Sequence, residues 1–229
     1  MRFAYYDSLS KANQRIYRAS DAVEKVPIPE PGAVEEAIAT VAEALPKARR
    51  GRVTEALQQL ADTLNDQLGI DRCDVRVLSK RPSKDWGELH GQYETKDDTG
   101  PARITVWMRT AQRKQIVAFK SFFRTFLHEW AHHLDYEHLE LADSFHTRGF
   151  YQRESNLFRQ LVPDPARLAG SAARSATDAE PAPRRARRRS SSARSASTDS
   201  RSESEAKSPP RAKNPRENVD NWTQTQLPF

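Results

Sequence analysis

The sequence predicts an α+β fold in which N-terminal helices precede a small, mostly antiparallel sheet, a long buried helix and a disordered C-terminal tail. Three observations carry this prediction. Apolar residues recur at helical spacing in the first third of the chain, β-branched segments follow, and large apolar residues become rare near the end. The expected regions are a helical region at 1–69, a core at 70–168, a disordered tail at 169–220 and a terminal segment at 221–229.

The helical region contains two stretches with helical periodicity, residues 8–20 and 33–68. Pro29 and Pro31 separate them, and Gly51 is the expected point of division within the second stretch. Apolar residues of the second stretch recur mostly at steps of three and four: Val34, Ala37, Ile38, Val41, Leu45, Val53, Leu57, Leu60, Leu64 and Leu68. Nothing in either stretch suggests chemistry, so we interpret both as packing helices.

The core begins with segments of strand character. Residues 75–78 and 104–108 are rich in β-branched side chains and are bounded by charged or turn residues. Residues 89–94 are a weaker strand candidate, and residues 97–101 predict a turn that leads this strand back toward 104–108. These patterns predict a largely antiparallel sheet.

Two helices are expected after the sheet, at residues 115–136 and 148–161. The first has a wide apolar arc, so most of it should be buried. Pro163 and Pro165 end the second. The motif with the clearest chemical meaning lies within the first of these helices.

The basic charge of the chain is concentrated in the tail. Residues 1–168 hold 25 Lys and Arg against 24 Asp and Glu, whereas residues 169–229 hold 12 against 7. Residues 184–194 form an Arg-rich run without acids, which suits binding of DNA phosphates, and a tail that only solubilises the chain is the competing interpretation. Residues 221–229 regain Trp, Leu and Phe, so we interpret them as a docking peptide for a partner protein.

The sequence also bears on location. Cys73 is the only cysteine, which excludes a disulfide within the chain and a Cys-based zinc site. The N-terminal residues lack the basic and apolar pattern of a signal peptide. No apolar run approaches the roughly 18 residues of a membrane span. A cytoplasmic protein without membrane association is therefore expected.

His128, Glu129 and His132 form an HExxH string within the expected helix 115–136. Residues four apart lie on one helix face, so the two imidazoles can share one ion, and neutral imidazoles suit Zn²⁺. The Glu129 carboxylate can reach a zinc-bound water and act as general base. Burying these groups without a metal would be costly in so apolar a helix. The string predicts one Zn²⁺ and hydrolytic chemistry.

A catalytic zinc needs a third protein ligand. His138 has the spacing of HExxHxxGxxH, but Asp135 occupies the position of the glycine that lets the chain turn. Glu154 has the distance expected of a glutamate on a following helix. His146 begins the next helical stretch. Spacing alone leaves the three candidates open.

The HExxH string followed by His146-Thr147-Arg148-Gly149-Phe150 resembles the SprT-like and related minimal zincins. In that family a third histidine lies in an H-[G/S/T]-x-x-[F/W] segment. The resemblance covers roughly residues 70–162, departs in having Thr147 where Gly is usual, and lacks a Cys cluster. It implies a zincin-like fold, a zinc site completed by His146, and an edge strand at 104–108 that lines the cleft.

Three further residues are candidates for supporting roles. Asp135 can hold the second ring nitrogen of a histidine ligand, although a solvated acid fits equally well. Tyr151 and Arg153 follow His146 and can stabilise the oxyanion of a tetrahedral intermediate. For Arg153 a salt bridge is the competing interpretation.

The predicted function is a zinc metallopeptidase that acts on an extended peptide added beside residues 104–108. The alternative is a non-catalytic, zinc-stabilised adaptor for nucleic acid or protein, which Glu129 disfavours because a structural site needs no base. Spartan-type relatives cleave proteins crosslinked to DNA, using a DNA-binding tail and a clamp-docking peptide. That resemblance implies DNA-associated substrates, and residues 224–229 loosely resemble a sliding-clamp peptide.

Overall fold

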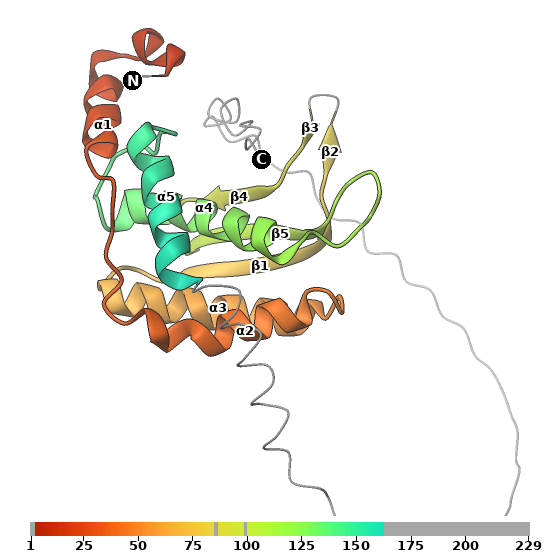
Figure 1. Ribbon diagram of the computed structural model, residues 1–229. Coiled ribbons are helices and arrows are strands. Elements are labelled where there is room, and N and C mark those ends of the chain that lie inside the picture. Colours follow the sequence, from red (N-terminus) through yellow and green to blue (C-terminus); the bar gives the residue numbers. More distant parts are fainter. Residues whose placement is uncertain (1–2, 85–86, 99, 163–229) are drawn as a thin grey trace, which may run out of the picture. The chain divides into compact units, whose positions relative to one another are not determined.

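The structure, a computed structural model, describes residues 3–84, 87–98 and 100–162. The tail expected at 169–220, its Arg-rich run at 184–194 and the docking segment at 221–229 lie outside the described residues. The predicted α+β class is confirmed for the described part of the chain (Figure 1).

Helices dominate the two ends of the described chain, and the strands lie between them. In chain order the elements are the 3₁₀ helix η1 (Ala4–Ser8), α1 (Lys11–Asp21), the 3₁₀ helix η2 (Pro31–Val34), α2 (Glu35–Ala44), α3 (Arg50–Leu68), β1 (Cys73–Lys80), β2 (Ser83–Lys84), β3 (Gly87–Glu88), β4 (Gly91–Glu94), β5 (Ala102–Arg109), α4 (Phe119–Glu137) and α5 (Arg148–Leu161). No helix in these described ranges has the length and apolar character to cross a bilayer.

Two helix boundaries differ from the sequence prediction. The stretch 33–68 divides after Ala44, near Pro46, and not at Gly51, which lies in the first turn of α3. Proline has no backbone N–H to continue the helical hydrogen bonds, so it interrupts the helix more strongly than glycine does. Helix α4 begins at Phe119 and not at 115, because Val117 still donates its N–H to the β5 carbonyl of Met108 at 2.8 Å.

The main sheet has the strand order β1-β5-β4. Strand β4 pairs antiparallel with β5, as the expected turn requires, but β1 pairs parallel with β5 over the longer ladder, from Cys73↔Ala102 to Lys80↔Arg109. The expectation of a mostly antiparallel sheet is therefore wrong for this ladder. The chain passes through β2, β3 and β4 before β5 inserts between β4 and β1.

The position of β5 corrects a second expectation. With β1 on one side and β4 on the other, β5 is the central strand, so residues 104–108 are not an edge strand. All five of these residues are buried, as in a strand covered on both faces. The strand that lies at an edge of the sheet and also contacts α4 is β4.

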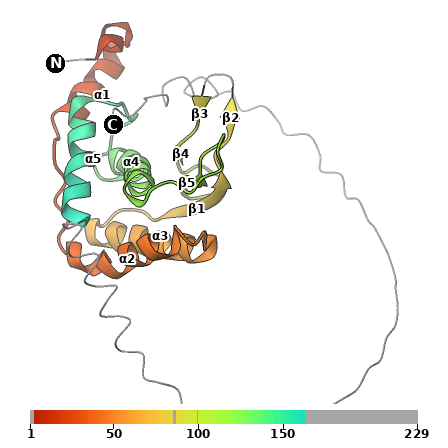
Figure 2. The same ribbon diagram turned by 45° about the vertical axis from the view of Figure 1, so that its right-hand side comes forward.

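The helices cover the sheet from two sides (Figures 1 and 2). Helix α3 packs against β1, with α2 beside it, while α4 lies across β5 and β4. Helix α5 packs on α4, and α1 packs on α5. The expected regions 1–69 and 70–168 share one hydrophobic core, in which the indole N–H of Trp130 donates to Asn65 Oδ1 at 2.8 Å. Because Trp130 is held in this core, the rotation of α4 about its axis is fixed, and so is the direction of the side chains on its other faces.

Candidate metal centre

Helix α4 places His128 and His132 one turn apart, with ring centroids 5.0 Å from each other. The buried residues of α4, among them Phe126, Leu127 and Trp130, anchor the helix in the core. Because this apolar packing fixes the rotation of the helix, both imidazoles project together toward α5 and the loop before it.

His146 reaches the same point from the loop between α4 and α5. Its Nε2 lies 3.0 Å from Nε2 of His128 and 3.1 Å from Nε2 of His132. Nitrogens that bind one tetrahedral zinc at about 2.0–2.1 Å are about 3.3 Å apart. Within the described part of the chain, these histidines are the one group of three or more His, Cys, Asp or Glu side chains near enough to hold an ion together.

The loop that carries His146 is fixed at both ends. At its beginning, the backbone N–H of Leu141 donates to the carbonyl of Asp135 at 2.9 Å. At its end, the Thr147 hydroxyl caps α5 by accepting from Phe150 N–H at 2.9 Å. Thr147 therefore supplies a helix cap at the position where the SprT-like motif usually has Gly. The hydroxyl of Tyr5 also donates to the carbonyl of His146, at 2.9 Å.

The other two proposed ligands lie elsewhere. His138 is the C-cap of α4, is exposed, and is not part of the histidine group. Glu154 is buried on α5 and faces the far nitrogen of His128, with Oε2 3.0 Å from Nδ1. The structure thus brings His146 next to His128 and His132, whereas Glu154 contacts the ring nitrogen of His128 that points away from them.

Glu154 fixes the ring of His128. Its carboxylate can only accept, so Nδ1 of His128 donates and Nε2 is left to face the other histidines. Burial lowers the pKa of His128, but the bond to Glu154 and nearby carboxylates outweigh it and hold the pKa above its usual value. A carboxylate behind a histidine ligand orients the ring and raises its basicity.

His132 has a different support, which passes through a serine. Its Nδ1 lies 2.7 Å from Ser144 Oγ, and the Ser144 hydroxyl donates to Asp135 Oδ2, also at 2.7 Å. Because the hydroxyl proton goes to Asp135, Nδ1 of His132 is the donor to Ser144, and its Nε2 faces His146. Burial holds the pKa of His132 well below its usual value, so the imidazole is neutral, as a metal ligand must be.

Asp135 and Arg153 form a fully buried ion pair behind this serine. The guanidinium of Arg153 also donates to the carbonyl of Ser20 at 2.7 Å and to its hydroxyl at 3.0 Å. Arg153 is therefore committed to Asp135 and to α1, and it has no exposed surface with which to meet a substrate. This arrangement favours the salt-bridge interpretation of Arg153 over an oxyanion role.

Removing the serine hydroxyl should weaken the support of His132. We expect Ser144→Ala to lower zinc affinity by about 10- to 100-fold, the range seen when the partner of a histidine ligand is lost. Competition with a chromophoric chelator would measure the change. Ser155→Ala, on the surface side of α5, is the control and should bind zinc like the unchanged protein. Equal affinities for all three proteins would contradict the role given to Ser144.

Glu129 lies beside the histidines with an incomplete set of partners. The side chain is buried, and its Oε2 accepts no hydrogen bond from any residue that the structure describes. Burial raises the pKa of this carboxyl to about 7, while the nearby His128 lowers it and Glu154 raises it further. A buried carboxylate oxygen without a donor is costly unless another group, such as a metal-bound water, meets it.

Aromatic side chains surround the centre. The ring of Phe150 lies 5.1, 4.7 and 5.2 Å from the rings of His128, His132 and His146. Tyr151 stacks on His146 at 5.7 Å, and Tyr93 of β4 stacks on His132 at 6.3 Å. Phe150 occupies the [F/W] position of the segment that begins at His146, whereas nothing in the sequence marks Tyr93, because an aromatic residue in a strand looks the same whether it packs on leucine or on a histidine of the centre.

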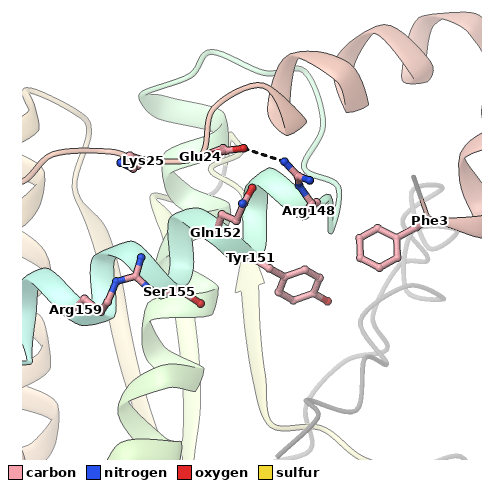
Figure 3. Close-up of a pocket in the computed structure, with 8 residues that line it drawn as sticks. All are labelled: Phe3, Glu24, Lys25, Arg148, Tyr151, Gln152, Ser155 and Arg159. Atoms are coloured by element: carbon pink, nitrogen blue, oxygen red, sulfur yellow. Dashed lines mark hydrogen bonds and ion pairs between the residues drawn. The ribbon is translucent and has the colours of Figure 1, made fainter. Parts of the chain in front are cut away.

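A surface hollow of about 470 Å³ lies next to Tyr151 (Figure 3). The ring of Tyr151 projects from α5 toward Phe3, and Arg148 is paired with Glu24 at 3.0 Å. The remaining lining residues are Lys25, Gln152, Ser155 and Arg159. None of the three histidines lines this hollow, so it adjoins the centre without being part of it.

These residues fit a divalent ion such as Zn²⁺. Three ring nitrogens converge, the far nitrogens of His128 and His132 are held by Glu154 and Ser144, and a buried carboxylate oxygen on the same helix lacks a donor among the described residues. In comparisons with known proteins, no family model, curated protein or solved structure matches the chain.

Proposed function

We propose that the chain is a zinc-dependent metallopeptidase of the SprT-like, minimal zincin type. The observation that carries the proposal is the convergence of His128, His132 and His146 beside the buried carboxylate of Glu129, one oxygen of which has no donor among the described residues. His128 and His132 share helix α4 with Glu129, so a single element positions two ligands and a base. A zinc site of purely structural kind has no use for such a base.

In this proposal His128, His132 and His146 hold the ion, and bound Zn²⁺ supplies Lewis-acid polarisation of the water and of the scissile carbonyl. Glu129 accepts a proton from the attacking water, whose oxygen bonds to the carbonyl carbon. Glu129 then delivers that proton to the departing amide nitrogen as the C–N bond breaks.

Strand β4 is the edge that supports binding of an extended substrate. The opposite edge, β1, is covered by Gln58 of α3, whose side chain accepts from Val75 N–H at 2.7 Å and donates to the Cys73 carbonyl at 2.9 Å. Strand β4 ends the sheet on the side where Gly91 meets Glu129. A peptide that adds to β4 would therefore lie beside the proposed base. The basic run 184–194 favours DNA-bound proteins as substrates.

The direct test is metal-dependent cleavage. We expect the full chain loaded with one equivalent of Zn²⁺ to cleave an unfolded protein, with or without bound DNA, and a chelator to stop the reaction until zinc is restored. Gel electrophoresis and mass spectrometry of the fragments would follow the cleavage. A chain that binds one zinc tightly but cleaves neither substrate would support the alternative, a zinc-stabilised adaptor.

A further inference from the structure

Gly91 is the first residue of the edge strand β4, and it is buried. The side chain of Glu129 lies directly on it. A Cβ built at Gly91 would be 2.3 Å from Oε1 of Glu129, 2.7 Å from its Cγ and 2.8 Å from its Cδ. Such distances are far below the ordinary carbon contact of about 3.5–4.0 Å. The carboxylate thus occupies the space that any other residue at position 91 would need.

The glycine is required here for space and not for backbone conformation. Among the described glycines only Gly69 has a positive φ, so the backbone of Gly91 is open to other residues. The contact also involves more than the flexible end of the Glu129 side chain, because Cγ and Cδ collide as well as Oε1. Helix α4 is packed in the core on its other side, so the whole carboxylate group would have to swing away.

We infer that Gly91 is a positioning residue for Glu129, and that the missing Cβ sets where the carboxylate lies relative to β4 and the histidines. This inference rests on the proposed function for its catalytic consequence, but the contact itself is independent of it. Strand β4 then has two tasks: its edge receives the peptide backbone, and its glycine seats the base beside that backbone.

The contact can be tested without any activity. In the metal-free full chain, Gly91→Ala should lower the Tm by roughly 2–12 °C, as expected for overpacking in a chain of this size. In a Glu129→Ala background, where the colliding atoms are gone, the same substitution should have little effect on Tm. If Gly91→Ala alone does not fold, recovery of folding by Glu129→Ala supports the same conclusion.

A matched control is Gly51→Ala, because a Cβ at Gly51 meets nothing within 4 Å. Its effect on Tm should be small and equal in both backgrounds. An equal loss of Tm from Gly91→Ala in both backgrounds would show that the collision is not with Glu129, and would overturn the inference whether or not the chain is a peptidase.

The catalytic consequence has its own readout. In the zinc-loaded protein, Gly91→Ala should reduce kcat at least about tenfold, with KM and zinc affinity near those of the unchanged protein, because displacement of a base by about 1 Å is costly. Adding Gly91→Ala to Glu129→Gln should cause no further loss of kcat. An unchanged kcat in Gly91→Ala would refute the positioning role and leave the proposed function standing.

Discussion

His146→Ala is expected to lower zinc affinity by more than about 100-fold and to abolish cleavage, whereas His138→Ala should leave both unchanged. The first substitution removes the nitrogen that lies 3.0 Å from Nε2 of His128 and 3.1 Å from Nε2 of His132. A lost ligand should cost more than a lost hydrogen-bonding partner of a ligand, which costs about 10- to 100-fold. Metal analysis after dialysis and competition with a chromophoric chelator would measure the affinities.

His138 makes this a matched comparison, since it is the same residue type on an adjoining segment but is exposed at the end of α4. The His146→Ala chain should also keep its local fold, because Tyr5 bonds to the backbone carbonyl at position 146 and not to the side chain. Zinc bound as tightly by His146→Ala as by the unchanged protein would exclude His146 as a ligand. Loss of zinc from His138→Ala would point to the HExxHxxGxxH arrangement instead.

The parts of this molecule that sequence predicts well are those with local causes. Two residues four apart on a helix share a face whatever surrounds them, so the relation of His128 to His132 follows from spacing alone. The apolar arc that buries α4 is equally local, and so is the end of α5 at Leu161, which the sequence predicts from Pro163. Spacing could not choose among His138, His146 and Glu154, because the path of the loop between α4 and α5 decides which of these side chains meets His128 and His132.

The parts that sequence missed depend on residues far apart in the chain. Ser20 and Arg153 are separated by 133 residues, yet their bond links α1 to the pair that supports Ser144. The order of the strands is likewise set by long-range pairing. The family resemblance implied an edge strand at residues 104–108, but these residues lie in the central strand β5. Gly91 carried no signal, since only the folded structure places it under Glu129.

Glu129→Gln should reduce kcat by about 10²–10⁴-fold and leave zinc affinity within a few-fold of the unchanged protein. The amide has nearly the same shape as the carboxylate and can lie over Gly91, but it cannot take a proton from water. Steady-state cleavage by zinc-loaded protein measures the loss. Glu55→Gln, exposed on α3, controls for the general effect of removing a carboxylate. Full activity in Glu129→Gln would remove Glu129 from the mechanism.

The same substitution should make the metal-free protein more stable above pH 7. Burial raises the pKa of Glu129 from 4.5 to about 7. The contribution of this group to the free energy of unfolding is therefore fully present below about pH 4.5 and is lost as pH rises through about 7, where the buried carboxyl ionises. That shift corresponds to about 3 kcal/mol at high pH. Glutamine escapes this loss, so the Tm of the variant should exceed that of the unchanged protein at pH 8 and converge with it near pH 4.

Parallel curves of Tm against pH for the two metal-free proteins would show that burial does not raise the pKa of Glu129 as described above. If the two curves of Tm against pH diverge and Glu129→Gln also loses kcat, both results have the same physical cause. A carboxylate held out of water with one oxygen unpartnered among the described residues destabilises the fold, and that same condition leaves it free to accept a proton from a water at the centre.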